Sequence, residues 1–106
     1  MTIPDNVTDI GGYSFRSCSG LTSVTIPNSV TIIRDSAFKG CSGLTSLTIG
    51  NSVKNIGEDA FNGCRGLTSI SYTGTIAQYK AISKGRWWND GVPATVVHCT
   101  DGDVAI

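Results

Sequence analysis

The chain has 106 residues, of which 40% are hydrophobic and 15% are charged, and its eight basic and eight acidic residues balance. This length predicts one domain with one core. A neutral chain without a basic cluster argues against nucleic acid as the main partner, and against attachment to a membrane through a polybasic surface. Because no run of about 18 apolar residues occurs, we expect no membrane insertion.

The N-terminal residues Met1–Asp5 have neither a basic start nor a long apolar run, so they form no signal peptide. They match the last part of a strand in the repeat described next. The chain thus opens inside a repeat and leaves an apolar end uncovered. We therefore expect further repeats upstream in the natural protein, or self-association through the uncapped N-terminal end.

A 23-residue period organises most of the chain. Residues 21–43 and 44–66 are identical at 14 of 23 positions. A partial repeat over residues 1–20 precedes them, and a truncated repeat over 67–72 follows. Repeats of this length are typical of solenoids, in which each coil buries its apolar face only against its neighbours. Residues 1–72 therefore predict a repeat region, and residues 73–106 predict a C-terminal cap.

Each repeat contains one clear strand. In Ser46–Ile49, polar and apolar residues alternate, which indicates a half-buried strand, and Gly50-Asn51 follows as a turn. We expect the coils to stack in register as an α/β solenoid, a right-handed coil with a parallel β-sheet on one face. Stacking also predicts a phenylalanine column of Phe15, Phe38 and Phe61. We interpret this column as core packing and not as a ligand slot.

The repeat pattern L-x-x-L-x-I, followed by Pro or Gly before Asn, an Ile and A-F-x-G-C, resembles the BspA-like leucine-rich repeats. The residues after Tyr72, including Trp88-Asn89 and Val97–Gly102, are similar to the closing segment of that family. The resemblance implies a leucine-rich-repeat fold in a bacterial secreted or cell-surface protein. It also implies adhesion to host proteins or to other cells. An architectural family transfers its fold better than its partners.

The C-terminal cap begins with a capping box. Thr75 and Gln78 have the spacing that satisfies the first free N–H groups of a helix, predicted over residues 76–84 and ended by Gly85. A loop over residues 86–93 follows. Adjacent Trp87 and Trp88 cannot easily point the same way, so one should cover the last coil while the other either packs in the cap or stands exposed as a partner contact. Ala94–Cys99 predicts the final strand, with Asp101–Asp103 as a turn after it.

The four cysteines offer no paired metal motif. Cys18, Cys41 and Cys64 lie 23 residues apart, which places them on one edge of the solenoid, whereas Cys99 aligns with a strand. We interpret the first three as inert stacked thiols; a disulfide or a metal site is the alternative. His98 is the only histidine, and no nucleophile, zinc or phosphate-loop motif accompanies it. We therefore expect no enzyme activity and no cofactor.

The outer face of the predicted sheet is the candidate partner-binding surface. Its polar side chains either fill an ordinary exposed sheet or form a flat hydroxyl-lined surface for a host or cell-surface protein or a glycan. The alternative is a purely structural cap or stalk with no ligand of its own. The predicted surface comprises Ser23, Thr25, Ser46, Thr48, Ser69, Ser71 and His98.

Overall fold

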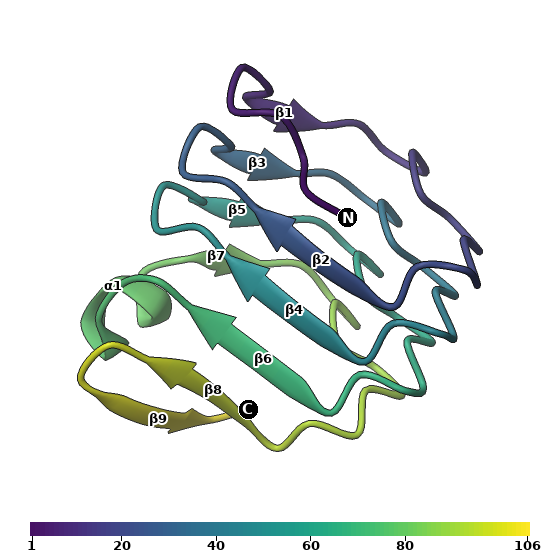
Figure 1. Ribbon diagram of the computed structural model, residues 1–106. Coiled ribbons are helices and arrows are strands. Elements are labelled where there is room, and N and C mark those ends of the chain that lie inside the picture. The colour runs from purple at the N-terminus through teal and green to yellow at the C-terminus, as the bar shows by residue number, and fades with distance from the viewer.

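The computed structural model describes all residues 1–106. The chain winds as a solenoid in which two β-sheets form two sides of each coil and a series of turns forms the third (Figure 1). The long sheet contains, in order, β2 (Ser23–Ile26), β4 (Ser46–Ile49), β6 (Ser69–Tyr72), β8 (Val96–Cys99) and β9 (Gly102–Ala105). The short sheet contains β1 (Asp9–Ile10), β3 (Ile32–Ile33), β5 (Asn55–Ile56) and β7 (Ser83–Lys84). The single helix, α1, is Ile76–Lys80.

The register of the long sheet confirms the repeat. Strands β2, β4 and β6 pair in parallel, with Ser23 opposite Ser46 and Ser46 opposite Ser69. Each pair is separated by one period of the sequence, so identical side chains meet across the strands. The parallel solenoid predicted from the sequence is therefore confirmed.

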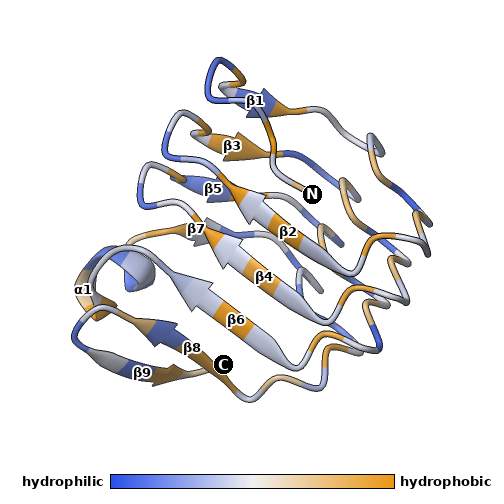
Figure 2. Ribbon diagram, in the orientation of Figure 1, coloured by the Kyte–Doolittle hydropathy of each residue, from blue (hydrophilic) through white to orange (hydrophobic).

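The core lies between the two sheets and the turns. Apolar bands alternate with polar ones along the long strands (Figure 2). In the phenylalanine column, the rings of Phe15 and Phe38 lie 5.0 Å apart at 6°, and those of Phe38 and Phe61 lie 5.1 Å apart at 4°. Burying each such side chain contributes about 1.5–3 kcal/mol to folding. The column is thus core packing, as the sequence predicted.

The short sheet was not predicted from the sequence. Its strands are only two residues long, too short to show a periodic pattern. Backbone hydrogen bonds hold it together, such as that from the Gly57 N–H to the Ile33 carbonyl at 2.7 Å. Ile33 and Ile56 point into the core, while Ile32 is half-buried and Asn55 is exposed.

Two positions in each coil adopt a left-handed backbone conformation. The first lies where the chain leaves the short sheet and enters the turns, and in the first three coils its N–H donates to the neighbouring coil, as in Tyr13 N–H to Asp35 O at 3.1 Å. Non-glycine residues rarely adopt positive φ, and bulky ones are outliers. The residues at the first position are Tyr13 (φ 62°), Ser36 (58°), Asp59 (59°) and Trp87 (60°), and those at the second are Ser17, Gly40, Gly63 and Gly91.

The cap corrects the predicted helix. Its start is as expected, because Gln78 N–H donates to Thr75 Oγ1 at 3.2 Å and Thr75 N–H donates to Gln78 Oε1 at 2.8 Å. The helix ends at Ala81 and not at Gly85, however. Ser83 N–H instead donates to the Lys54 carbonyl at 3.0 Å, so β7 continues the short sheet. Backbone pairing with the neighbouring coil outweighs the local preference for helix.

The strand predicted over Ala94–Cys99 is present as Val96–Cys99 and pairs in parallel with β6, as expected. It is not the final strand, because β9 follows it in an antiparallel hairpin. Gly102 and Asp103, predicted as a turn, belong to β9, whereas Thr100 and Asp101 make the turn. The antiparallel β9 covers the edge of β8, which a parallel coil would otherwise have to pair.

The N-terminal coil is less covered than the others. Thr2 makes a single parallel bridge to Thr25, and the Met1 amino group donates to the Ser23 carbonyl at 2.8 Å. Phe15 is half-buried, whereas Phe38 and Phe61 are fully buried. A hollow of about 240 Å³ lies at this end. No helix of the chain has both the length and the hydrophobicity needed to cross a bilayer.

Candidate functional site

The long-sheet face carries the residues predicted from the sequence. Alternation along β2, β4 and β6 sends Val24, Leu47 and Ile70 into the core, so their neighbours point outward. Two columns of hydroxyl side chains result. One consists of Ser23, Ser46 and Ser69, and the other of Thr25, Thr48 and Ser71, with His98 opposite Ser71 on β8.

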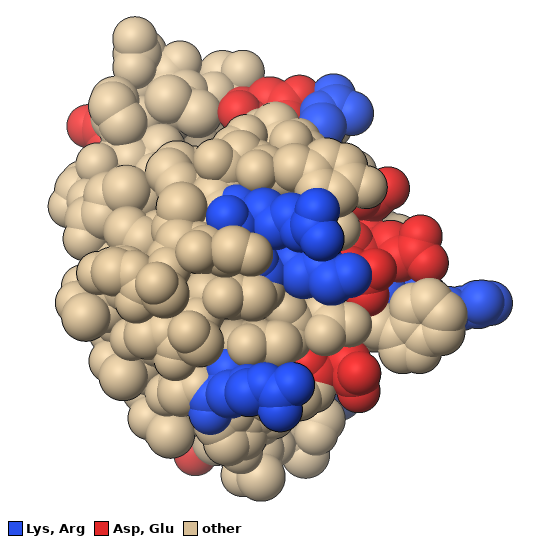
Figure 3. Space-filling view, turned by 90° about the vertical axis from the view of Figure 1, so that its right-hand side faces the viewer, with Lys and Arg blue, Asp and Glu red and all other residues tan.

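This face carries few charges. In the space-filling view, Lys, Arg, Asp and Glu gather on one half of the molecule and leave most of the other half uncharged (Figure 3). At the N-terminal ends of the strands, hydroxyls also bond the coil before them. Thr45 Oγ1 donates to the Thr22 carbonyl at 3.0 Å, and Thr68 Oγ1 donates to the Thr45 carbonyl at 3.4 Å. These bonds hold the coils at a fixed spacing.

His98 has a partner that sequence reasoning missed. Its Nδ1 lies 2.8 Å from Asp103 Oδ1, and both side chains are about half exposed. Asp103 reaches this position because β9 folds back antiparallel on β8, which places the two residues opposite each other. The only sign of this strand in the sequence is the alternation in Asp103–Ala105. His98 and Asp103 thus form a contact between two ionisable side chains on a face that otherwise carries hydroxyls.

A shallow hollow lies where the long strands end. It measures about 510 Å³ and includes Thr25 and Thr48 of the predicted surface. Asn28 forms part of its wall and is held by the Asn51 N–H, which donates to Asn28 Oδ1 at 3.1 Å. Asp5 supplies a carboxylate. The hollow provides hydroxyl, amide and carboxylate groups, but no aromatic surface.

The two tryptophans divide as the sequence suggested they could. Trp88 is 8% exposed and meets the Phe61 ring edge-on at 6.4 Å, so it closes the phenylalanine column. Trp87 is 53% exposed, and the Arg86 guanidinium lies 5.1 Å from its ring centroid. The left-handed backbone at Trp87 turns it outward. It lies on the opposite side of the coil from the long-sheet face, and its role as a partner contact stays a prediction.

All four cysteines are free. Cys41 Sγ donates to the Phe15 carbonyl at 3.0 Å, and Cys64 Sγ donates to the Phe38 carbonyl at 3.2 Å. Contact with Cys41 and burial both raise the pKa of the Cys64 thiol. The same contact lowers the pKa of Cys41, so the two thiols titrate as a pair. Cys41 and Cys64 are fully buried and bonded to core carbonyls, so both act as core residues.

The cap contains a buried tyrosine hydroxyl, that of Tyr79. Tyr79 packs edge-on against Tyr72 at 5.8 Å, and its hydroxyl is buried without a hydrogen-bond partner. Burial, followed by the charge of Cys99, raises the pKa of Tyr79 to about 12. Lys84 lies 4.6 Å from the Tyr79 ring centroid, and burial lowers the pKa of Lys84. Tyr79 and Lys84 line a hollow of about 330 Å³ between α1 and β9, whose other lining residues are mostly apolar.

No cluster of three or more His, Cys, Asp or Glu side chains has the arrangement of a metal site. Asp101, considered with the turn after the last strand, accepts from the Ile76 N–H through Oδ1 at 2.8 Å. It therefore fixes the start of α1.

Comparison with known proteins agrees with this architecture. A family model described as the BspA type leucine rich repeat region (6 copies) matches residues 1–83. A solved structure of a leucine rich cell surface protein from Faecalibacterium prausnitzii A2-165 is similar, with 27% sequence identity and a TM-score of 0.45. The match covers 78% of this chain and 34% of that one, so the chain spans about a third of its length. No curated protein matches the sequence. Because the family model covers most of its residues, the chain belongs to the BspA-type leucine-rich-repeat family.

Proposed function

We propose that the chain is a non-enzymatic binding module of a bacterial secreted or cell-surface protein. It acts in adhesion or protein–protein interaction, and it contacts a host or cell-surface protein through the long-sheet face. The observation that carries the proposal is the pair of in-register hydroxyl columns, Ser23–Ser46–Ser69 and Thr25–Thr48–Ser71. The family resemblance supports the surface location.

The shape and chemistry of the face favour a protein partner. A face of parallel strands presents an extended surface, and the hollow at its end contains no aromatic ring on which a small ligand could stack. The hydroxyls donate and accept hydrogen bonds, so they tolerate many polar partner groups. Since aromatic anchors are absent from this face, one copy should bind weakly, and several adjacent copies would gain affinity through multivalency.

The proposal is tested by binding to a panel of host extracellular-matrix proteins and glycans. Thr48→Arg places a long cation in the middle of the face and should abolish binding to the matrix proteins while the protein stays folded. Lys54→Arg, an exposed change away from the face, is the matched control. Binding that survives Thr48→Arg would contradict the proposal. If wild type binds no protein and no glycan, a structural cap or stalk is favoured instead.

The proposed self-association through the N-terminal end is tested separately by light scattering, in which the average mass should grow with protein concentration.

A further inference from the structure

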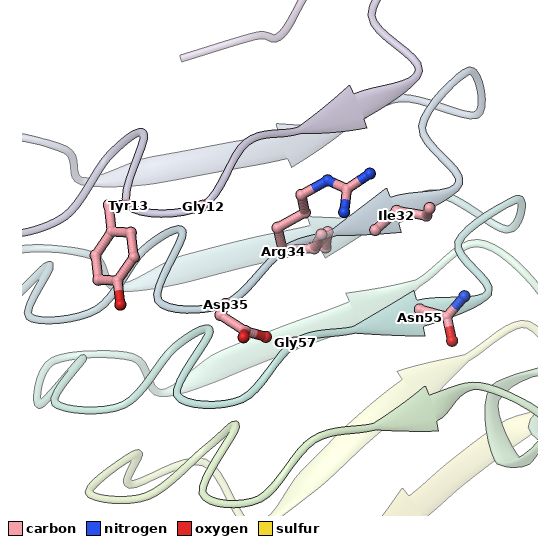
Figure 4. A pocket seen from close by; sticks show the side chains of 8 residues that line it. Gly12, Tyr13, Ile32, Arg34, Asp35, Asn55 and Gly57 are labelled. Carbon is pink, nitrogen blue, oxygen red and sulfur yellow. The ribbon is translucent and has the colours of Figure 1, made fainter.

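A second hollow lies on the opposite side of the coil, over the short sheet. It measures about 390 Å³ and is open to solvent. Its floor is formed by β3 and by the backbone of the coil after it, and side chains from three successive coils stand around it (Figure 4). The lining residues are Gly12, Tyr13, Ile32, Ile33, Arg34, Asp35, Asn55 and Gly57.

Glycine creates the space around Arg34. In the stacked coils, Arg34 occupies the position taken by Gly11 in the coil before and by Gly57 in the coil after. Neither neighbour has a side chain to fill the gap. At Gly57 a side chain is excluded, because a Cβ there would overlap the Asp35 amide nitrogen and lie 2.5 Å from the Arg34 carbonyl carbon. The hollow is therefore built into the backbone and does not depend on a side-chain rotamer.

The polar side chains around the hollow are held in place but only partly used. Arg34 donates from Nε and Nη2 to both oxygens of Asp9, at 2.6–2.9 Å. These bonds and the Asp9 charge raise the pKa of Arg34, so it stays a cation. Asp35 accepts the Glu58 N–H through Oδ1 at 2.9 Å, which fixes the plane of its carboxylate. Arg34 Nη1, Asp35 Oδ2 and the exposed Asn55 amide are left for a ligand.

Tyr13 supplies an aromatic surface at one end. It is 61% exposed and has a left-handed backbone, although its equivalent in the next coil is the small, buried Ser36. The Tyr13 N–H bonds the Asp35 carbonyl at 3.1 Å, so the ring is tied to the coil that carries the acid. Arg16 lies 5.7 Å from the ring centroid. A large ring thus stands at one end of the hollow, Asp35 and Arg34 lie in its middle part, and the Asn55 amide lies at the other end (Figure 4).

We propose that this hollow binds a pyranose sugar, either free or at the end of a glycan. A sugar ring carries hydroxyls around its edge and C–H groups on its faces. Planar carboxylate, amide and guanidinium groups match neighbouring hydroxyls as acceptors and donors. The electron-rich face of a tyrosine ring matches the C–H groups. A volume of about 390 Å³ falls within the range of small-molecule sites, roughly 300–1,000 Å³.

The sugar site is independent of the long-sheet face. The side chains that line the hollow come from the short sheet and the turns that follow it, and none belongs to the hydroxyl columns. One chain then holds two surfaces with different partners. Failure of protein binding at the long sheet would leave the sugar proposal intact, and the reverse holds as well.

The test uses the whole chain, labelled with nitrogen-15, and a panel of methyl pyranosides: glucoside, galactoside, mannoside and N-acetylglucosaminide. At least one should shift the amide resonances of Tyr13, Arg34, Asp35 and Asn55 in a saturable way. Tyr13→Ala should weaken that binding roughly tenfold, the loss expected for one aromatic contact. Tyr13→Phe, which keeps the ring, should bind within about twofold of wild type.

Trp87→Ala is the matched control. Trp87 occupies the same left-handed position as Tyr13, is also exposed and also lies beside an arginine, but it does not line the hollow. Its removal should leave sugar binding unchanged. The proposal is overturned if no pyranoside shifts the hollow's amides up to its solubility limit, if the shifts fall on the long-sheet face, or if Trp87→Ala weakens binding as much as Tyr13→Ala does.

Discussion

The two outward faces of this solenoid differ in how closely their side chains repeat from coil to coil. Along the long sheet, each coil repeats the hydroxyls of the one before, as in Ser23–Ser46 and Thr25–Thr48. The two full repeats differ at 23 − 14 = 9 positions, and six of these pair residues 31–39 with residues 54–62. Those segments carry the short sheet and the turn that follows it, where most charges gather (Figure 3). A repeated face suits a broad partner, whereas a face that changes with each coil can build one local site.

Both faces depend on the same core. Phe38→Ala removes the middle ring of the phenylalanine column and leaves a cavity between Phe15 and Phe61. We expect it to lower the free energy of unfolding by about 3–5 kcal/mol. Urea denaturation followed by circular dichroism measures the loss. A loss below about 1 kcal/mol would show that the coils do not share one packed core.

The short-sheet face depends on close backbone approach. Gly57→Ala introduces a Cβ that overlaps the Asp35 backbone, so we expect a loss of about 1–3 kcal/mol in urea denaturation. Gly20→Ala is the matched control, because a Cβ there meets nothing within 4 Å. It should change stability by no more than about 0.5 kcal/mol. Equal effects at the two glycines would mean that the hollow's floor is not fixed by packing.

Tyr79, buried in the cap, lies outside both faces and provides a reference. Tyr79→Phe removes a buried hydroxyl that has no partner and should stabilise the protein by about 1 kcal/mol. The folded pKa of Tyr79, about 12, exceeds the ordinary 10.0. Its ionisation therefore leaves the free energy of unfolding of wild type unchanged below pH 10.0 and lowers it as the pH rises from 10.0 toward about 12. The advantage of Tyr79→Phe should grow over this interval. An advantage that stays constant with pH would place the hydroxyl in contact with water.

Tyr13 sharpens the comparison because its backbone is strained in a left-handed conformation although its ring is exposed. Tyr13→Gly relieves the left-handed conformation and should stabilise the fold by about 0.5–1 kcal/mol, measured by thermal and urea unfolding. The same change should abolish sugar binding in the hollow. A variant that is less stable than wild type would show that Tyr13 serves packing instead of display.

The sequence predicted the long strands and the start of α1, but it missed the two-residue strands of the short sheet and the later part of the cap. Period and alternation are enough to place Ser46–Ile49 in a parallel sheet, because the same signal recurs in each coil. The end of α1 and strand β9 have no second copy to reveal them. Both are decided by pairing with neighbouring strands, as between Ser83 and Lys54.

The two candidate surfaces differ in the same way. The hydroxyl columns follow from the period, so the sequence alone predicts them. The hollow joins Tyr13, Arg34 and Asn55 from three coils, and only the geometry of stacking brings them together. One signal was present: Arg34 occupies a repeat position that is glycine in the neighbouring coils. Its meaning depends on the close backbone approach at Gly57.

The most direct test of two separate faces compares Thr48→Arg and Tyr13→Ala in one pair of assays, matrix-protein binding and pyranoside titration by NMR. The free energy of unfolding of each variant should lie no more than about 0.5 kcal/mol below that of wild type. We predict that Thr48→Arg loses only protein binding and that Tyr13→Ala loses only sugar binding. If either substitution removes both activities, or if each leaves its own activity intact, the division of function between the faces is contradicted.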